Sequence, residues 1–398
     1  MPDRTTLVTA LQGAGWHPAA WRTAGPAAQR LTSLRHWRDV VVEQDRLGVD
    51  AVTIEDSFTA GPVDATGELD TGSVVGRLDA LLVANAVAPA TRAIGLVPTV
   101  SVTHTEPFHV ATGLQTLDHV SQGRAGWRVQ VSPTPREAAL FGRRPGGDEA
   151  AVLFDEAREV AEVVSRLWDS WDDDAIIRDV TTGRFIDRDR IHNAEFEGSF
   201  VSVHGASIVP RSPQGRPPVF SLAHRADAAA FAVDAADVVL VTPGYGGLEA
   251  RDTLALVRDA EQAAGSDVRR PALADLAVLI GSSSAAAADA LAALDAAAGA
   301  PYASASDTSV LATTVPELVT RIGDLRDLGF AGVRLRPLRI PLDSTAIARE
   351  LVPALVTAGL RADVASRPTA DLRTRLGIAP AVSRYASVSG SAPVEVSA

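Results

Sequence analysis

The sequence predicts an α/β protein, specifically a TIM (β/α)8 barrel with insertions. Short runs rich in Val, Ile and Leu alternate with longer segments that mix apolar spacing with charged faces. This alternation is typical of buried parallel strands joined by crossover helices. Eight segments of each kind can be counted, which is the number that a closed barrel needs. An open doubly wound sheet would give a similar alternation over part of the chain, so periodicity alone does not decide between the two.

Each expected strand is a short apolar run, and each is followed by a segment with helical spacing. The strands are expected at 7–11, 51–54, 94–97, 127–131, 219–222, 238–241, 276–280 and 333–335. The helices are expected at 31–47, 78–88, 108–120, 149–168, 226–235, 248–263, 285–298 and 315–328.

Two segments interrupt this alternation. Residues 175–217 carry many turn residues and short alternating runs, which predicts an extended hairpin insertion. Residues 282–314 are rich in Ala and Ser, which predicts a helical excursion before the last barrel unit. We expect residues 1–386 to form a single domain and residues 387–398, which lack periodicity, to form a flexible tail.

Composition narrows the possible functions. The chain has 398 residues, no Cys, and a formal net charge of −12, and every one of its 37 basic residues is Arg. Thiol nucleophiles, lysine Schiff bases and lysine phosphate loops are therefore excluded. The acidic balance disfavours a nucleic-acid partner. The sequence shows no signal-peptide pattern and no membrane-span pattern, so we expect a cytoplasmic protein that does not bind membranes.

In a barrel, chemistry is expected where strands end at the carboxyl-terminal face. Asp56 follows the second strand, where its carboxylate could orient a ligand or form an Asx turn. Thr99 and His104 belong to a polar stretch after the third strand. His104 is the member that helix capping explains least, and a ligand-facing imidazole is one interpretation of it.

The fourth and fifth strands end in further polar residues. Arg128, Gln130 and Ser132 alternate with valines, so one set of side chains can face the barrel mouth. Arg128 there needs an anion, which could be a ligand or a neighbouring carboxylate. Ala223, His224 and Arg225 precede an expected helix whose N-terminus could hold an anion, or could simply be capped.

The sequence does not point to a metal site or to a dinucleotide loop. His192 and His204 lack metal-ligand spacing, so no metal is expected. The glycines of 243–247 lack the spacing of the dinucleotide fingerprint.

Several longer runs match a known family. They are Trp-His-Pro-Ala-Ala-Trp-Arg at 16–22, Leu-Asp-His-Val-Ser-Gln-Gly-Arg-Ala-Gly-Trp at 117–127, Leu-Trp-Asp-Ser-Trp at 167–171, Gln-Gly-Arg-Pro-Pro at 214–218 and Leu-Arg-Thr-Arg-Leu-Gly at 372–377. In these runs the chain resembles the flavin-dependent monooxygenases related to bacterial luciferase, in particular the nitrilotriacetate and dibenzothiophene-sulfone monooxygenase branch. The resemblance spans nearly the whole chain.

The resemblance implies a TIM barrel that uses reduced FMN, supplied by a separate NAD(P)H-dependent flavin reductase, to activate O2 and oxidise a small organic substrate. It also implies a homodimer or homotetramer. In this hypothesis His17 and His104 are catalytic and line the substrate side. The flavin is contacted by Asp56, Thr99, Arg128, Gln130, Ser132, Phe154, Ala223, His224 and Arg225.

The chain departs from the family pattern at several of these positions. Arg128 stands where the family has Asn, Phe154 where it has Tyr, and His104 where a Tyr is common. Residues 221–225 replace a Gln-Ala-Gly-x-Ser stretch that helps to hold the flavin phosphate. Arg128 and Arg225 could compensate as phosphate contacts or could occupy the pocket. Three alternatives therefore stay open: a deazaflavin-dependent enzyme, an enzyme that degrades flavin, and a non-catalytic barrel paralogue.

Overall fold

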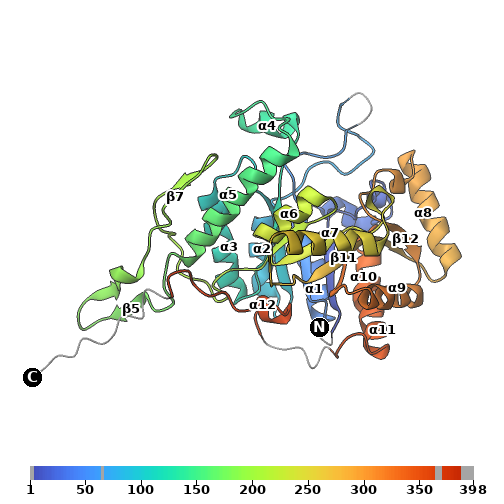
Figure 1. Ribbon diagram of the computed structural model, residues 1–398. Helices are drawn as coiled ribbons and strands as arrows, with labels where there is room; N and C mark the ends of the chain where they lie inside the picture. Colours follow the sequence, from blue (N-terminus) through green and yellow to red (C-terminus); the bar gives the residue numbers. More distant parts are fainter. Residues whose placement is uncertain (1–3, 64–66, 364–369, 387–398) are drawn as a thin grey trace, which may run out of the picture.

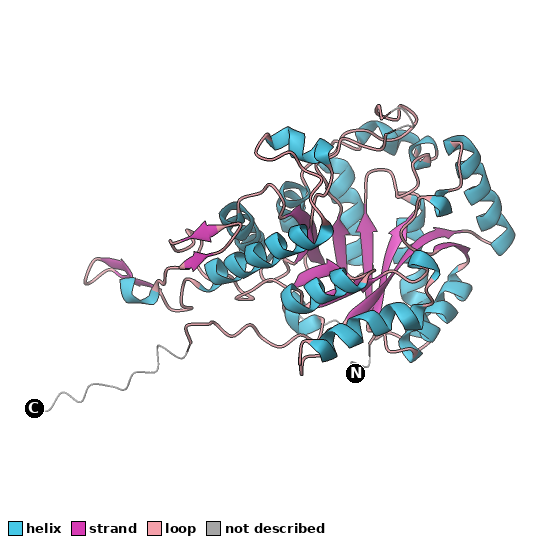
Figure 2. Cartoon of the chain, turned by 45° about the horizontal axis from the view of Figure 1, so that its top comes forward, coloured by secondary structure: helices cyan, strands magenta, loops and turns pink. Residues whose placement is uncertain are grey.

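The computed structural model describes residues 4–63, 67–363 and 370–386, and over these ranges the chain forms a closed parallel barrel (Figures 1 and 2). The ring pairs β1 with β2, and β13 with β1, so that no edge is left open. Within the described residues its eight strands, in ring order, are β1 (Thr6–Leu11), β2 (Ala51–Ile54), β3 (Gly95–Ser101), β4 (Trp127–Gln130), β9 (Val219–Leu222), β10 (Val238–Val241), β11 (Ala272–Ile280) and β13 (Gly332–Pro337). The expected fold class and all eight expected strands are confirmed.

Helices cover the outside of the barrel because each presents an apolar face to the sheet. In chain order they are α1 (Leu34–Arg46), α2 (Ala80–Val87), α3 (Pro107–Ser121), α5 (Ala150–Asp169), α6 (Ala226–Ala235), α7 (Ala250–Ala263), α9 (Val315–Asp327) and the continuous segment α10 (Leu342–Ala346), η7 (Ile347–Leu351) and α11 (Val352–Thr357). The segment after β13 was not among the expected helices, because Pro341 and Pro353 interrupt its helical pattern.

The first insertion differs from the expected single hairpin. Residues 175–217 contain two short antiparallel pairs, β5 (Ile176–Asp179) with β6 (Arg184–Ile186), and β7 (Phe196–Glu197) with β8 (Ser202–Val203). They form an arm that projects away from the barrel (Figure 1). The pairs are short because turn residues recur every few positions.

The second insertion is only partly helical. It contains α8 (Ser284–Ala298), as expected, and also a strand, β12 (Val310–Thr313). β12 pairs in parallel with β11, with Ala277 opposite Val310 and Ile280 opposite Thr313. It can do so because the nine-residue β11 continues beyond the ring and exposes an unpaired edge.

The expected flexible tail at 387–398 lies outside the described residues. In the described part of the chain, no helix combines the length and the apolar character needed to cross a bilayer.

Candidate active site

A chain of buried ion pairs fills the interior of the barrel beneath its mouth. Glu55, directly after β2, pairs with Arg128 of β4 at 2.9 Å and with Arg334 of β13. Arg334 pairs at 2.7 Å with Asp275 of β11, which also accepts from Arg336. Arg336 reaches Asp307 in the second insertion. We call these six residues the charge chain; it holds three cations and three anions, and two of the cations, Arg334 and Arg336, lie on β13.

The charge chain is internally neutral, and its ion pairs and hydrogen bonds satisfy all but a few of its polar atoms, which allows most of it to be buried. The side chains of Arg334 and Asp275 are 0% exposed. Burial alone raises the pKa of Glu55, but Arg128 and Arg334 outweigh it and hold that pKa below its usual value. The indole of Trp16 lies over the Arg336 guanidinium, 4.5 Å from the ring centroid to Cζ.

Sequence reasoning missed Glu55, Asp275 and Arg334. A signal for them exists, because Asp275 and Arg334 are charges placed inside otherwise apolar strands. A charge at such a position needs a partner on a neighbouring strand.

Arg128 forms an ion pair with a carboxylate of the protein itself. Besides the ion pair with Glu55, its Nη1 donates to Thr99 Oγ1 at 3.0 Å and to Gln130 Oε1 at 2.9 Å. Gln130 Nε2 in turn donates to the backbone carbonyl of Asp56 at 3.1 Å. The structure thus brings four of the predicted flavin-contacting residues together at the strand ends.

Asp56 and Ser132 have structural partners at the same face. The Asp56 carboxylate accepts from the amides of Ser57 at 2.8 Å and Ala80 at 2.9 Å, so it fixes the start of α2. Burial raises the pKa of Asp56. Ser132 Oγ shares a hydrogen bond of 2.8 Å with Ser101 Oγ.

His104 occupies a strained position at the mouth. Its φ is +71°, in the left-handed region that costs a non-glycine residue roughly 1–2 kcal/mol. Its ring stacks on Phe141 of α4 (Pro135–Phe141) with centroids 5.0 Å apart. Burial and the neighbouring Arg144 lower the pKa of His104, so the imidazole is neutral near pH 7. Strain of this kind persists where the surrounding structure imposes it, often at functional sites.

Ala223, His224 and Arg225 connect β9 to α6. The buried Ala223 donates its amide to the carbonyl of Leu240 at 2.8 Å. The His224 ring packs edge-on against Tyr245, and burial lowers the pKa of His224. Arg225 is the N-cap of α6 without a side-chain cap bond, and its half-exposed guanidinium pairs with Asp227.

His17 and Phe154 have different neighbours. His17 is buried, and its Nδ1 accepts from the Ala19 amide at 3.1 Å. In the neutral ring the proton is therefore on Nε2, which donates to Asp295 Oδ1 of α8 at 3.0 Å. His17 thus ties α8 to the barrel mouth. Phe154 of α5 stacks on Phe231 of α6, with centroids 5.3 Å apart.

Four buried polar atoms at adjacent strand ends lack a hydrogen-bond partner in the described structure. They are His104 Nε2 after β3, Arg128 Nε on β4, His224 Nδ1 after β9 and Thr242 Oγ1 after β10. Because β3, β4, β9 and β10 are consecutive in the ring, these atoms follow one arc of the mouth. Buried polar atoms in native proteins are usually satisfied by a protein group, an ordered water or a ligand. The arc suits a ligand with several polar atoms, as a flavin has.

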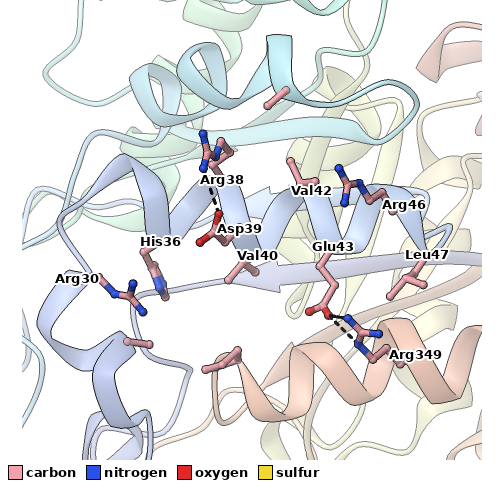
Figure 3. A pocket seen from close by; sticks show the side chains of 13 residues that line it. Arg30, His36, Arg38, Asp39, Val40, Val42, Glu43, Arg46, Leu47 and Arg349 are labelled. Atoms are coloured by element: carbon pink, nitrogen blue, oxygen red, sulfur yellow. Dashed lines mark hydrogen bonds and ion pairs between the residues drawn. The ribbon is translucent and has the colours of Figure 1, made fainter.

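A cleft of about 840 Å³ lies elsewhere, on the outside of the barrel between α1 and the α10–η7 segment (Figure 3). Its lining comes from outer helix faces rather than from strand ends. Glu43 crosses it to Arg349 at 2.7 Å and accepts from Thr345 Oγ1 at 2.7 Å. We therefore assign this cleft to helix packing. Over the described ranges no cluster of His and carboxylate residues has the makings of a metal site.

Comparisons with known proteins identify the family of the chain. A family model described as luciferase-like monooxygenase matches residues 14–366. The chain is 32% identical over 238 residues to N-acetyl-S-(2-succino)cysteine monooxygenase of Bacillus subtilis, covering 59% of this chain and 52% of that protein. It is 34% identical to nitrilotriacetate monooxygenase component A of Aminobacter aminovorans, covering 52% and 47%. The chain spans about half the length of the curated relatives it matches.

Solved structures show the same fold. The structure of a long-chain alkane monooxygenase superposes with a TM-score of 0.82 at 21% identity, covering 95% of this chain and 96% of that one. A curated dibenzothiophene-sulfone monooxygenase of Rhodococcus erythropolis is 34% identical, covering 50% of this chain and 44% of that protein, so both enzymes named for the branch are among the relatives of the chain. The family model covers well over half of the chain, and the chain therefore belongs to the luciferase-like monooxygenase family.

Proposed function

We propose that the chain is a two-component FMN-dependent monooxygenase that uses reduced FMN and O2 to oxidise a small organic substrate. In this reaction one oxygen atom enters the substrate, the other leaves as water, and FMN is oxidised. The observation that carries the proposal is the arc of unpartnered buried polar atoms at the ends of β3, β4, β9 and β10. Family membership supports FMN as the cofactor that these atoms would contact.

The β9–α6 turn suits the phosphate of FMN. The N-terminus of a ten-residue helix carries a partial positive charge, and the cap residue Arg225 adds a guanidinium. His224 Nδ1 supplies a further polar atom at the same turn. Asp227 already pairs with Arg225, so the phosphate would share or displace that carboxylate.

The polar groups of the mouth suit the ring system. Thr99, Arg128 and Gln130 form a connected hydrogen-bonded floor, and Arg128 Nε is its open donor. Asp56 and Ser132 fix the backbone around that floor. Ala223 and Phe154 contribute apolar surface, although Phe154 already packs on Phe231.

Bound reduced FMN supplies the electrons with which O2 is activated. The residues of the chain hold the cofactor, exclude water and position the substrate. His104 presents a neutral imidazole with a free Nε2, which is suited to a proton transfer at the substrate side. His17 acts through its hydrogen bond to Asp295, which holds α8 against the mouth on that side.

Because the flavin is used in its reduced form, the proposal includes a separate NAD(P)H-dependent flavin reductase as partner. We further propose that the chain forms a homodimer or homotetramer in the cytoplasm and binds neither nucleic acid nor membranes.

The test is a titration of the purified chain with oxidised and reduced FMN, followed by oxygen uptake with a flavin reductase. We expect FMN to bind and Arg128→Asn to weaken binding, because it removes the Nε donor and leaves Glu55 with one guanidinium fewer. Arg136→Gln, outside the barrel, is the matched control. No FMN binding by the native chain would refute the proposal. Improved binding by Arg128→Asn would show that the guanidinium obstructs the site instead of contacting the cofactor.

A further inference from the structure

A second cavity, of about 270 Å³, lies at the amino-terminal ends of β1, β11 and β13, on the face opposite the mouth. Its walls are the ends of α7 and α9 and the residues that follow α12 (Leu372–Arg375). In Figure 1, α9 and α12 lie at the same end of the barrel as the N-terminus, whereas α4 lies at the other end. This amino-end cavity is therefore separate from the candidate active site.

Arginines dominate the lining of the amino-end cavity. They are Arg4, Arg258, Arg269, Arg270 and Arg326, and no described lining residue is acidic. In a chain with a net charge of −12, such a cluster of positively charged side chains needs a physical reason.

The positive charges of the cavity are only partly matched. Arg4 shares the Asp50 carboxylate with Arg361, and Arg258 pairs with Glu261 at 2.9 Å. The Arg270 guanidinium donates to carbonyls such as that of Ala236, which carry no full charge.

The last two arginines are unmatched. Among the described residues, the side chains of Arg269 and Arg326 make neither an ion pair nor a hydrogen bond. The end of α9 explains part of the placement of Arg326, since a cation there complements the helix dipole. It does not explain why Arg269, from a different segment, faces the same cavity. An anion bound in the cavity would give both guanidiniums a partner.

The floor of the cavity is apolar. Pro271 and Ala331 are partly exposed there, and the buried Phe330, Ala272 and Leu376 also line it. A free inorganic anion would leave that surface against water, whereas an organic anion would cover it. The volume is just below the usual range of small-molecule sites, so it admits a ligand about the size of one ring.

We propose that the amino-end cavity binds a small organic anion, with its carboxylate or phosphate paired with Arg269 and Arg326 and its apolar body against Pro271 and Ala331. The site is independent of the proposed FMN site, because it lies at the opposite ends of the strands. Its ligand is an effector or a stabilising ion rather than the substrate that is oxidised.

The probe is benzoate, with benzamide as its uncharged isostere, and binding is measured by calorimetry and by ligand-observed NMR on the full chain. The double variant Arg269→Gln/Arg326→Gln removes the unmatched charges without breaking any contact described above. Arg321→Gln, also on α9 but outside the cavity, is the matched control. Equal melting temperatures confirm that all variants fold.

We expect benzoate to bind at least about tenfold more tightly than benzamide, and the double variant to lose about tenfold or more of that affinity. Arg321→Gln should retain it, and saturation with FMN should leave it unchanged. The proposal is overturned if benzoate fails to bind at about 10 mM. It is also overturned if benzamide binds equally well, if the double variant keeps full affinity, or if FMN displaces benzoate.

Discussion

Asp275 is the residue whose replacement tests the charge chain most directly. Its carboxylate is 0% exposed and accepts from two guanidiniums, Arg334 Nη1 at 2.7 Å and Arg336 Nε at 3.0 Å. Asp275→Asn keeps the shape and one acceptor oxygen but removes the negative charge. The buried chain then carries a net charge of about +1 without water to solvate it.

Removing one partner of a buried ion pair costs about 3–5 kcal/mol, so we expect a loss of about 4 kcal/mol in the free energy of unfolding. Unfolding entropy of roughly 2.1 cal/mol/K per residue, over 398 residues, converts this loss to a fall of roughly 5 °C in melting temperature. The side chain of Arg334 is 0% exposed and that of Arg336 is 3% exposed, so solvent screening does not reduce the loss appreciably.

Urea unfolding followed by tryptophan fluorescence measures this loss, with Asp324→Asn on the exposed face of α9 as the matched control. We expect the control to stay within about 0.5 kcal/mol of the native chain. A loss below about 1 kcal/mol for Asp275→Asn would refute the reasoning, because it would mean that water or a rearranged side chain neutralises the cations.

Three further predictions concern pH and the loops at the mouth. The pKa of Glu55 is lowered by Arg128 and Arg334 against the opposing effect of burial, so its stabilisation is complete above pH 4.5 and is lost as pH falls through the lowered pKa. The difference in unfolding free energy between the native chain and Glu55→Gln should therefore shrink in acid; a constant difference down to pH 3 would contradict the ion pairing. Burial holds the pKa of His224 below 6.5, and a bound phosphate would raise it, so FMN affinity should increase as pH falls from about 7.5. Isothermal titration across this range should show that His224→Asn abolishes the dependence and that His204→Asn, on the arm, keeps it. Gly244 has a φ of +90°, and a Cβ there would lie 2.5 Å from Ser309 Oγ, so Gly244→Ala should lose about 2 kcal/mol in urea unfolding. Gly247→Ala has a φ of +79° but meets nothing within 4 Å, so it should lose less, and equal losses would show that the contact with Ser309 is unimportant.

The sequence by itself determined the alternation of strands and helices, because buried parallel strands need continuous apolar runs and the helices between them need one apolar face. The family resemblance, rather than this periodicity, selected the closed barrel over an open sheet. The sequence also determined where the strands end, and so placed Thr99, Arg128 and Gln130 at one face. The second insertion was harder to predict. β12 forms only because β11 extends beyond the ring, and the length of a strand relative to its neighbours is not a local property.

The tertiary structure decided what each polar residue meets. Arg128 faces Glu55, which lies 73 positions away in the sequence, and His17 meets Asp295 on an inserted helix. His104 Nε2 and His224 Nδ1 lack partners because of which side chains the fold places around them. Ion pairs across a barrel depend on which strands are adjacent and in which register, and that information belongs to the closed sheet rather than to any segment of the chain.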